Sequence, residues 1–320
     1  MSMFLNRIKK NYTHLNKWAK REKCSAFRIY DRDIPEYRYS VDYYNGSFVV
    51  YEFATEHTSD FDLDSDGETL EPEFSQLDEI ITELSNFFDV DREEIFIKQR
   101  KRQKGLSQYE KLELMGARRT VTEFGLKFIV NLSDYLDSGL FLDHRITRQM
   151  IGKMAHSKRV LNLFAYTGSA SVHAAAGGAA EVVTLDMSNT YLSWAQENMI
   201  LNGFTDDRYS YIREDAMKYL KSISARKSEF DLIFVDPPSF SNSKKMEGVF
   251  DVQDHHVGLL KDCLDFLPEG GKVVFSTNLR SFKINKDAFK DHILEDISKK
   301  TIPADFRNQR IHQAFILTKN

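Results

Sequence analysis

The chain has 320 residues, of which 42% are hydrophobic and 29% charged, a composition typical of a globular protein with one large or two ordinary domains. A formal net charge of −4 argues against a protein that coats nucleic acid indiscriminately, although a local basic patch could still bind RNA. The sequence has no apolar run near the roughly 18 residues that span a bilayer, no signal-peptide core, and only two cysteines, Cys24 and Cys263, so we expect a cytoplasmic protein without a disulfide framework.

Residues 1–130 predict an N-terminal helix followed by a small α+β domain. The helix, over residues 6–23, is basic and amphipathic, and we interpret it as a packing helix with a solvated Lys/Arg face rather than a direct RNA contact. Asn45-Gly46 predicts a hairpin turn, because both residue types tolerate positive φ. The other elements expected here are extended segments at 27–30, 37–44, 48–53 and 94–98, a helix at 74–88, and one or two strands within 121–132.

An acidic segment, residues 56–73, holds eight acids and no Lys or Arg. Asp62, Asp64, Asp66 and Glu73 have the spacing of a calcium loop. A predicted strand precedes the segment, whereas a helix precedes the calcium loop of an EF-hand. Thr69 stands at the position where an EF-hand loop normally has an aliphatic residue that pairs with a second EF-hand. We therefore favour a solvated acidic loop and expect no metal.

A basic cluster follows the predicted strand at 94–98. Five cations fall within seven residues, a density that favours phosphate binding and makes residues 1–130 an expected RNA-binding domain. Tyr109, close behind, could stack on a base. The cluster consists of Lys98, Arg100, Lys101, Arg102 and Lys104.

The segment from Val160 to Ser171 predicts a short buried strand, a tight turn at Gly168 and a small-residue helix. This order is the first unit of a doubly wound nucleotide-binding sheet. Gly168 would let the backbone approach a ligand closely, and the helix would point its positive N-terminus at that ligand.

Strands and helices then alternate, as in a parallel sheet. Residues 131–320 therefore predict a Rossmann-like α/β domain, with two late strands near 295–302 and 312–318 completing a seven-stranded sheet. The alternating strands are expected near 160–164, 182–186, 209–213, 230–235 and 271–277, and the helices near 169–176, 189–202, 214–223 and 252–266.

Carboxylates follow several of these strands, at the edge where doubly wound sheets bind ligands. The single turn glycine does not make the G-x-G-x-x-G pattern of a dinucleotide site, so we expect a nucleoside that carries an amino acid, S-adenosylmethionine. Asp186 is assigned to the ribose, Met187 to the adenine ring, and Asp215 with Ala216 to the adenine amino group. The methionine moiety is assigned to the backbone of Phe164, Ala165, Tyr166, Thr167 and Gly168.

The loop Asp236-Pro237-Pro238-Ser239-Phe240 is expected to face the methyl group and to carry the catalytic residues. The prolines stiffen the loop, and Phe240 can stack on a target base. Methylation at cytosine C5 needs a cysteine nucleophile, whereas the residue after the prolines is Ser239 and neither cysteine belongs to a motif. A nitrogen nucleophile, which needs no covalent step, is therefore favoured.

Three motifs, L-N-L-F-A-Y-T-G-S-A-S, V-D-P-P-S-F-S-N-S-K and Y-L-D-S-G-L-F-L-D-H-R, resemble those of the C-terminal half of the bacterial bifunctional 23S rRNA guanine methyltransferases, which are class I S-adenosylmethionine-dependent enzymes. The likeness runs from Asn6 to beyond Arg310. It implies methyl transfer to guanine N7 of 23S rRNA, naked or in a pre-50S particle, and a partner half with a THUMP domain and guanine-N2 activity. It also implies an antiparallel last strand.

By the same resemblance, residues 135–145 fold over the cofactor. Phe141 would pack near it, Asp143 or Arg145 would reach its polar atoms, and His144 would be structural rather than a base. Candidate rim contacts to RNA are Asn278, Arg280, Arg307 and Arg310.

Guanine N7 carries a lone pair, so no general base is required and catalysis would act by positioning. Asp236 could stabilise the charge on the purine, accept hydrogen bonds from the N1–H and N2–H edge, and contact the cofactor. Two alternatives stay open, a guanine-N2 methyltransferase and a non-catalytic RNA-binding subunit. Asn162, where many methyltransferases carry an acid, favours the latter.

Overall fold

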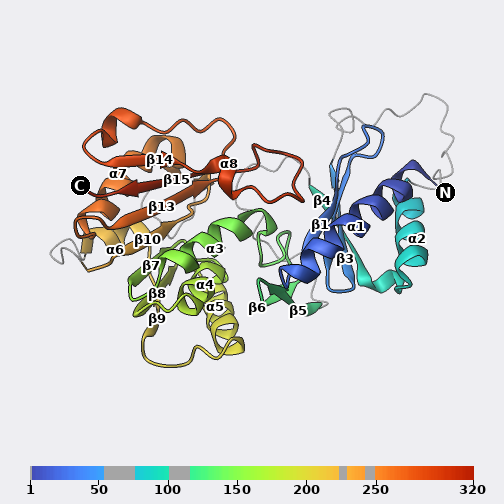
Figure 1. The fold of residues 1–320 in the computed structure, drawn as a ribbon, viewed down its shortest axis with the longest axis horizontal. Helices are drawn as coiled ribbons and strands as arrows, with labels where there is room; N and C mark the ends of the chain where they lie inside the picture. Colours follow the sequence, from blue (N-terminus) through green and yellow to red (C-terminus); the bar gives the residue numbers. More distant parts are fainter. Residues whose placement is uncertain (1, 54–75, 101–115, 223–228, 242–248) are drawn as a thin grey trace.

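A computed structural model describes residues 2–53, 76–100, 116–222, 229–241 and 249–320. Its two main sheets have four and seven strands, and lie in different parts of the molecule (Figure 1). The acidic segment 62–73 and the basic residues Lys101, Arg102 and Lys104 fall outside the described residues.

The four-stranded sheet has the order β1-β2-β3-β4. Helices α1 and α2 pack on one face of it, through apolar residues such as Phe4, Ile8, Ile80 and Leu84. The predicted hairpin is confirmed, because Tyr44 pairs with Ser47 across Asn45 and Gly46, which have φ of 51° and 102°. The elements are α1 (Met3–Arg21), β1 (Ala26–Asp31), β2 (Tyr39–Tyr44), β3 (Ser47–Phe53), α2 (Gln76–Phe88), η1 (Arg92–Glu94) and β4 (Ile95–Arg100).

A hairpin of β5 (Arg118–Glu123) and β6 (Leu126–Asn131) bridges the two parts of the molecule. On one side the Ser25 amide donates to the Thr122 carbonyl at 2.8 Å. On the other, the Ile129 amide donates to Asn198 Oδ1 at 2.8 Å, and Trp194 Nε1 donates to the Ile129 carbonyl at 3.0 Å. The hairpin therefore holds the segment before β1 against α5, a helix that packs on the larger sheet. The domain boundary expected after residue 130 stays a prediction.

The seven-stranded sheet has the order β14-β15-β13-β10-β7-β8-β9, in which β15 is antiparallel to β13 and β14, as predicted. The expected strands and helices between residues 160 and 277 are found within about two residues of their predicted ends. The elements are η3 (Leu142–His144), α3 (Arg145–Met154), β7 (Arg159–Leu163), α4 (Ser169–Ala176), β8 (Glu181–Asp186), α5 (Asn189–Leu201), β9 (Tyr209–Arg213), α6 (Ala216–Ser222), β10 (Leu232–Val235), β11 (Phe240–Ser241), β12 (Phe250–Asp251), α7 (Val252–Asp265), β13 (Lys272–Thr277), η4 (Lys286–Phe289), β14 (Ile293–Asp296), α8 (Ser298–Thr301) and β15 (Gln313–Thr318).

The strand predicted at 295–302 is present in the sheet as β14, but its bounds are wrong. The strand β14 ends at Asp296, whose Oδ1 accepts from the Ser298 amide at 2.9 Å and so helps to start the short helix α8. A polar side chain that bonds a nearby amide ends the strand here.

Helices cover both faces of the large sheet. α3, α4 and α5 contribute to one apolar core through residues such as Ile151, Val172 and Met199, and this core continues into the hairpin and the four-stranded sheet. α6 and α7 close the other face through residues such as Leu220 and Leu260. No helix in the described ranges is both long enough and apolar enough to cross a bilayer.

Arg145 joins segments that are distant in the sequence. Its Nη1 donates to Asp305 Oδ1 at 2.7 Å, its Nη2 donates to the Ala26 carbonyl at 2.9 Å, and Trp18 lies 5.1 Å from its guanidinium. Both side chains of the ion pair are 0% exposed, and Asp305 Oδ2 also accepts from the Arg28 amide. This cluster, here called the Arg145 clamp, connects α1, β1, α3 and the loop after α8.

Replacing Arg145 by Ala should lower the free energy of unfolding by about 3–5 kcal/mol, because the Asp305 carboxylate would stay buried without its cation. Urea titration followed by circular dichroism measures the loss. Arg208→Ala, which removes the ion pair of an exposed arginine with Asp206, is the matched control and should leave the midpoint almost unchanged. Equal midpoints for the two variants would contradict the role given to the clamp.

Candidate active site

A cavity of about 920 Å³ opens beside the carboxyl ends of β7, β8 and β10. This volume lies in the range of pockets for small organic ligands. Its walls come from both parts of the molecule, because β1, β2 and β3 supply one side and the large sheet supplies the other. Predicted site residues that line it are Phe141, Asp143, Phe164, Ala165, Tyr166, Asp186, Met187, Asp215, Ala216, Asp236, Pro237, Pro238, Phe240, Asn278 and Arg280.

The loop after β7 forms part of the floor. Phe164 and Tyr166 have φ of 53° and 51°, a left-handed conformation that costs of order 1–3 kcal/mol for each residue. The Ala165 amide donates to the Leu185 carbonyl at 3.0 Å, and the Tyr166 amide donates to Asp186 Oδ2 at 2.9 Å. These bonds to the end of β8 hold the loop in its strained form.

Gly168 packs closely against helix α5. It has φ of 69°, and a Cβ placed on it would lie 2.5 Å from the Ala195 Cβ of α5. Neither Gly168 nor Thr167 lines the cavity, and the Thr167 hydroxyl donates to the Gly139 carbonyl at 2.6 Å. The missing side chain therefore allows the turn to pack on α5, and the assignment of Gly168 to the cofactor stays a prediction.

Two acids at strand ends face the cavity and also bond to backbone amides. Asp186 Oδ1 accepts from the Ser188 amide at 2.8 Å, and burial raises the pKa of this carboxyl despite the amides around it. Asp215 Oδ1 accepts from the Met217 and Lys218 amides at 2.8 and 3.2 Å, so it caps α6 while it lines the cavity. Helix capping and ligand contact are compatible at this position.

Asp236 follows β10 and lies beside the proline loop. Ser276 Oγ donates to its Oδ1 at 2.8 Å, which fixes the direction of the carboxylate. Ser239 Oγ donates to Asn278 Oδ1 at 2.5 Å and ties the loop to the end of β13. Phe240 is 49% exposed at the mouth, so a planar ring could stack on it.

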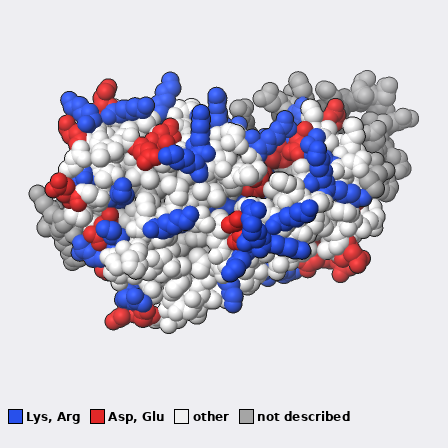
Figure 2. All heavy atoms as spheres, in the orientation of Figure 1, with Lys and Arg blue, Asp and Glu red and all other residues white. Residues whose placement is uncertain are grey.

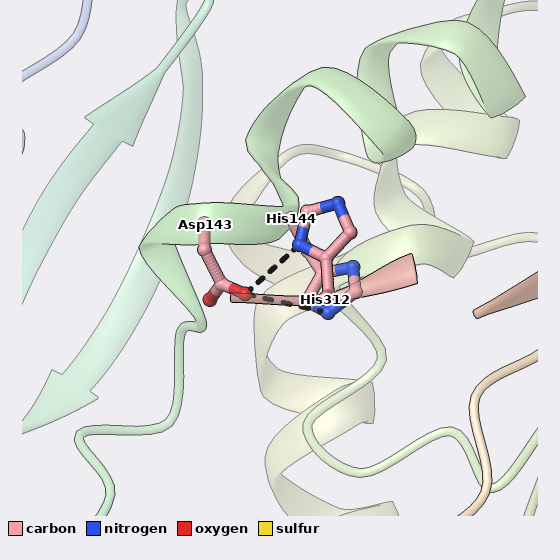
Figure 3. A group of neighbouring side chains, drawn as sticks. All are labelled: Asp143, His144 and His312. Carbon is pink, nitrogen blue, oxygen red and sulfur yellow. Dashed lines mark hydrogen bonds and ion pairs between the residues drawn. The ribbon is translucent and has the colours of Figure 1, made fainter. Parts of the chain in front are cut away.

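Segment 141–145 borders the cavity, and Figure 3 shows the side chains of Asp143, His144 and His312 converging from two segments far apart in the chain. Asp143 Oδ2 lies 3.1 Å from His312 Nδ1 and 3.6 Å from His144 Nε2. The two imidazole rings stack with centroids 4.3 Å apart. Burial lowers the pKa of His144, although the negative charge of Asp143 opposes this shift.

The same three residues have the donor types of a metal site, and their potential ligand atoms lie within 4.8 Å of one another. The Thr301 hydroxyl lies 3.0 Å from the Ser298 carbonyl and 3.0 Å from His312 Nε2. The other nitrogen of His312 faces the Asp143 carboxylate. A histidine–carboxylate contact thus accounts for the group, and we assign no metal to it.

Arg145 does not take the predicted place. Its guanidinium belongs to the Arg145 clamp and does not line the cavity, because Asp305 and the Ala26 carbonyl hold it in the interior. Lys98 is also wrong as an RNA contact, since it is 2% exposed on β4. Arg100 ends β4, while Arg307 and Arg310 are exposed in the loop before β15.

The sequence analysis missed one wall of the cavity. Arg28, with two bonds to Asp42 at 2.6 and 3.0 Å, lines it from the four-stranded sheet together with Tyr44 and Tyr51. Alternating residues in β2 and β3 could have indicated two different faces, but no local signal shows that one face meets the large sheet. Neither cysteine lines the cavity, and burial raises the pKa of the Cys24 thiol to about 11.

Gly168→Ala should lower the free energy of unfolding by roughly 1–3 kcal/mol, because Ala at positive φ is strained and its methyl group would overlap Ala195. Chemical denaturation measures the change. Gly203→Ala, also at positive φ but with open space around the added Cβ, is the control and should cost less. A larger loss at Gly203 would contradict the packing role.

The unfolding free energy should decrease as the pH falls below about 6.5, because the unfolded chain takes up a proton that the buried, neutral His144 does not. His144→Gln should make this decrease shallower between pH 7.5 and 5. The buried His173, whose pKa burial also lowers, should keep part of the slope. Urea titrations at several pH values test this, and an unchanged slope in the variant would refute it.

Comparisons with known proteins agree with this geometry. A family model described as S-adenosylmethionine-dependent methyltransferase matches residues 69–311. Proteins named ribosomal RNA large subunit methyltransferase K/L from Shewanella sediminis and Vibrio cholerae are 45% and 47% identical to the chain over 98% of its length. The chain spans only 43% of the length of these relatives.

Solved structures share the fold. A crystal structure described as that of a methyltransferase complexed with SAH superimposes with a TM-score of 0.77, at 21% identity, over 98% of this chain and 80% of that one. A structure described as a SAM-dependent methyltransferase from Streptococcus mutans gives a TM-score of 0.71 at 21% identity, over 99% and 82% of the two chains. At this identity the likeness supports the fold alone.

Proposed function

The chain belongs to the family of S-adenosylmethionine-dependent methyltransferases, and from this premise we propose that it methylates N7 of a guanine in 23S rRNA. In this proposal it corresponds to the C-terminal half of its longer relatives, whose other half would carry the THUMP domain and the guanine-N2 activity. The names of those relatives support a large-subunit rRNA substrate. The observation that carries the proposal is that Asp186, Asp215 and Asp236 line one cavity with the exposed ring of Phe240.

The cavity suits the cofactor of the family. S-adenosylmethionine carries ribose hydroxyls and an adenine amino group, which donate hydrogen bonds, and the two carboxylates of Asp186 and Asp215 can accept them. Each carboxylate accepts hydrogen bonds from at least two backbone amides and has further lone pairs for a ligand. We assign Asp186 to the ribose, Asp215 and Ala216 to the adenine edge, Met187 to the ring, and the backbone of Phe164 to Gly168 to the methionine moiety.

Asp236 would act on the other side of the cavity, where the base enters. The bound cofactor supplies a methyl group on a positively charged sulfur. Asp236, held by Ser276, would stabilise the positive charge that passes to the purine, or accept hydrogen bonds from the N1–H and N2–H edge. Phe240 would stack on the base, and Pro237 and Pro238 would hold the loop still.

Nitrogen rather than carbon is the favoured acceptor, because both thiols are buried away from the cavity and none could activate a pyrimidine ring. N7 is favoured over N2 because the N7 lone pair needs no proton removed. In-vitro methylation of 23S rRNA fragments, followed by nucleoside mass spectrometry, distinguishes 7-methylguanosine from N2-methylguanosine. The N2 product would overturn the choice of atom, and no product with any RNA would overturn the enzyme.

Asp236→Ala should reduce methyl transfer by at least about 100-fold, the scale of a lost electrostatic contact, while cofactor affinity largely survives. Ser276→Ala, which removes only the hydrogen bond that directs Asp236, should cost about tenfold. Single-turnover rates and isothermal titration with S-adenosylmethionine measure the two effects. Full activity of Asp236→Ala would remove this carboxylate from the mechanism.

A further inference from the structure

Helix α1 carries a continuous basic stripe on its solvent face. Its 19 residues include six Lys or Arg and no acid. Five exposed side chains recur at intervals of three and four residues, which places them on one face of a helix, opposite the buried Ile8 and Ala19. The stripe consists of Arg7, Lys10, His14, Lys17 and Arg21.

The surface view agrees with this arrangement. Figure 2 shows Lys and Arg side chains gathered over the region where α1 lies in front in Figure 1. From Arg7 to Arg21 the stripe extends about 21 Å, at 1.5 Å for each residue.

A groove of about 570 Å³ lies beside the N-terminal half of the stripe. Arg7, Lys10 and His14 line it from α1, and Arg307 and Gln309 line it from the loop before β15. The groove also contains acids, but these are occupied by other partners. Asp33 accepts from Asn11 at 2.8 Å, Asp305 belongs to the Arg145 clamp, and Asp31 lies 3.4 Å from Arg32.

Two cations of the stripe are available. Within the described part of the chain, Lys10 and Lys17 have no ion pair, whereas Arg7 lies 3.9 Å from Asp33 and Arg21 lies 3.0 Å from Glu22. These two lysines could bind a polyanion without breaking an ion pair with any described residue.

The groove lies next to the catalytic cavity, because Arg28 and Phe306 line both spaces. Arg307 donates from Nη1 to the carbonyl of Arg32, and Arg32 itself lines the catalytic cavity. A strand with one base in the catalytic cavity can therefore continue past Arg32 and Arg307 onto α1.

We propose that the basic stripe of α1 and its groove bind the phosphate backbone of the RNA substrate on one flank of the target base. This rests on the proposed function, and it replaces our interpretation of the basic face of α1 as merely solvated. An RNA backbone is the occupant we favour because the groove borders the cavity that would receive the base, and because counterion release makes such basic stripes bind phosphate.

The test uses Lys10→Glu with Lys17→Glu, two exposed positions away from the catalytic cavity. Affinity for a 23S rRNA fragment should fall roughly tenfold or more, and the slope of log affinity against log salt should flatten by about two, one for each lysine. Fluorescence anisotropy at several salt concentrations measures both. Affinity for S-adenosylmethionine should not change.

The matched control is Lys261→Glu with Lys290→Glu, which makes the same change of net charge on exposed residues of α7 and the segment after η4. The control should bind RNA as the wild type does, and Lys10→Arg with Lys17→Arg should also retain binding. Equal affinities and salt slopes for the α1 variant and the control would overturn the proposal.

A second measurement separates this proposal from the proposed function. A short oligonucleotide that fills the cavity without reaching α1 should be methylated equally by the wild type and by the Lys10→Glu, Lys17→Glu variant, while the long fragment should show a raised KM with the variant. If the wild type methylates RNA but both substrates behave alike, the α1 surface is refuted and the function stands. If the wild type methylates no RNA, both the α1 proposal and the proposed function are refuted.

Discussion

The active site depends on the buried ion pair of Arg145 with Asp305. One guanidinium contacts a β1 carbonyl, the loop before β15 and the ring of Trp18, so it holds the four-stranded sheet against the large one. The cavity lies between these two parts, and Arg28, whose amide bonds the same Asp305, lines it. The clamp therefore connects the two parts of the molecule that form the walls of the cavity.

The large sheet supplies the acidic side chains that line the cavity. Parallel strands end at one edge, so the acids after β8, β9 and β10 come together although they are up to 50 residues apart. The strained loop at Phe164 to Gly168 is kept in place by bonds to β8 and by its packing on α5. The four-stranded sheet adds a polar and aromatic wall, and α1 extends the basic surface away from the cavity.

Much of the large sheet could be predicted because its strands are short apolar runs with clear ends, and the convergence of Asp186, Asp215 and Asp236 followed from topology alone. Local reasoning failed where a partner is distant in the chain. Arg145 was expected at the cofactor because the sequence around it does not indicate an ion pair with Asp305, which is 160 residues away. The packing of Gly168 on Ala195 could not be predicted either, because the two residues lie on different elements. Lys98 was expected on the surface because it begins a row of cations. In β4, where successive side chains point to opposite faces, its side chain lies on a buried face.

The Arg145 clamp also limits the order in which parts of the protein can fold. Its three anchor points lie near the beginning, the middle and the end of the chain, at sequence separations of 119 and 160 residues. Asp305 follows β7, β8 and β10 in the sequence, so the clamp can close only after these strands have been synthesised, and contacts this remote form late during folding. A nascent chain would therefore contain the strands that line the cavity before the cavity itself could be completed.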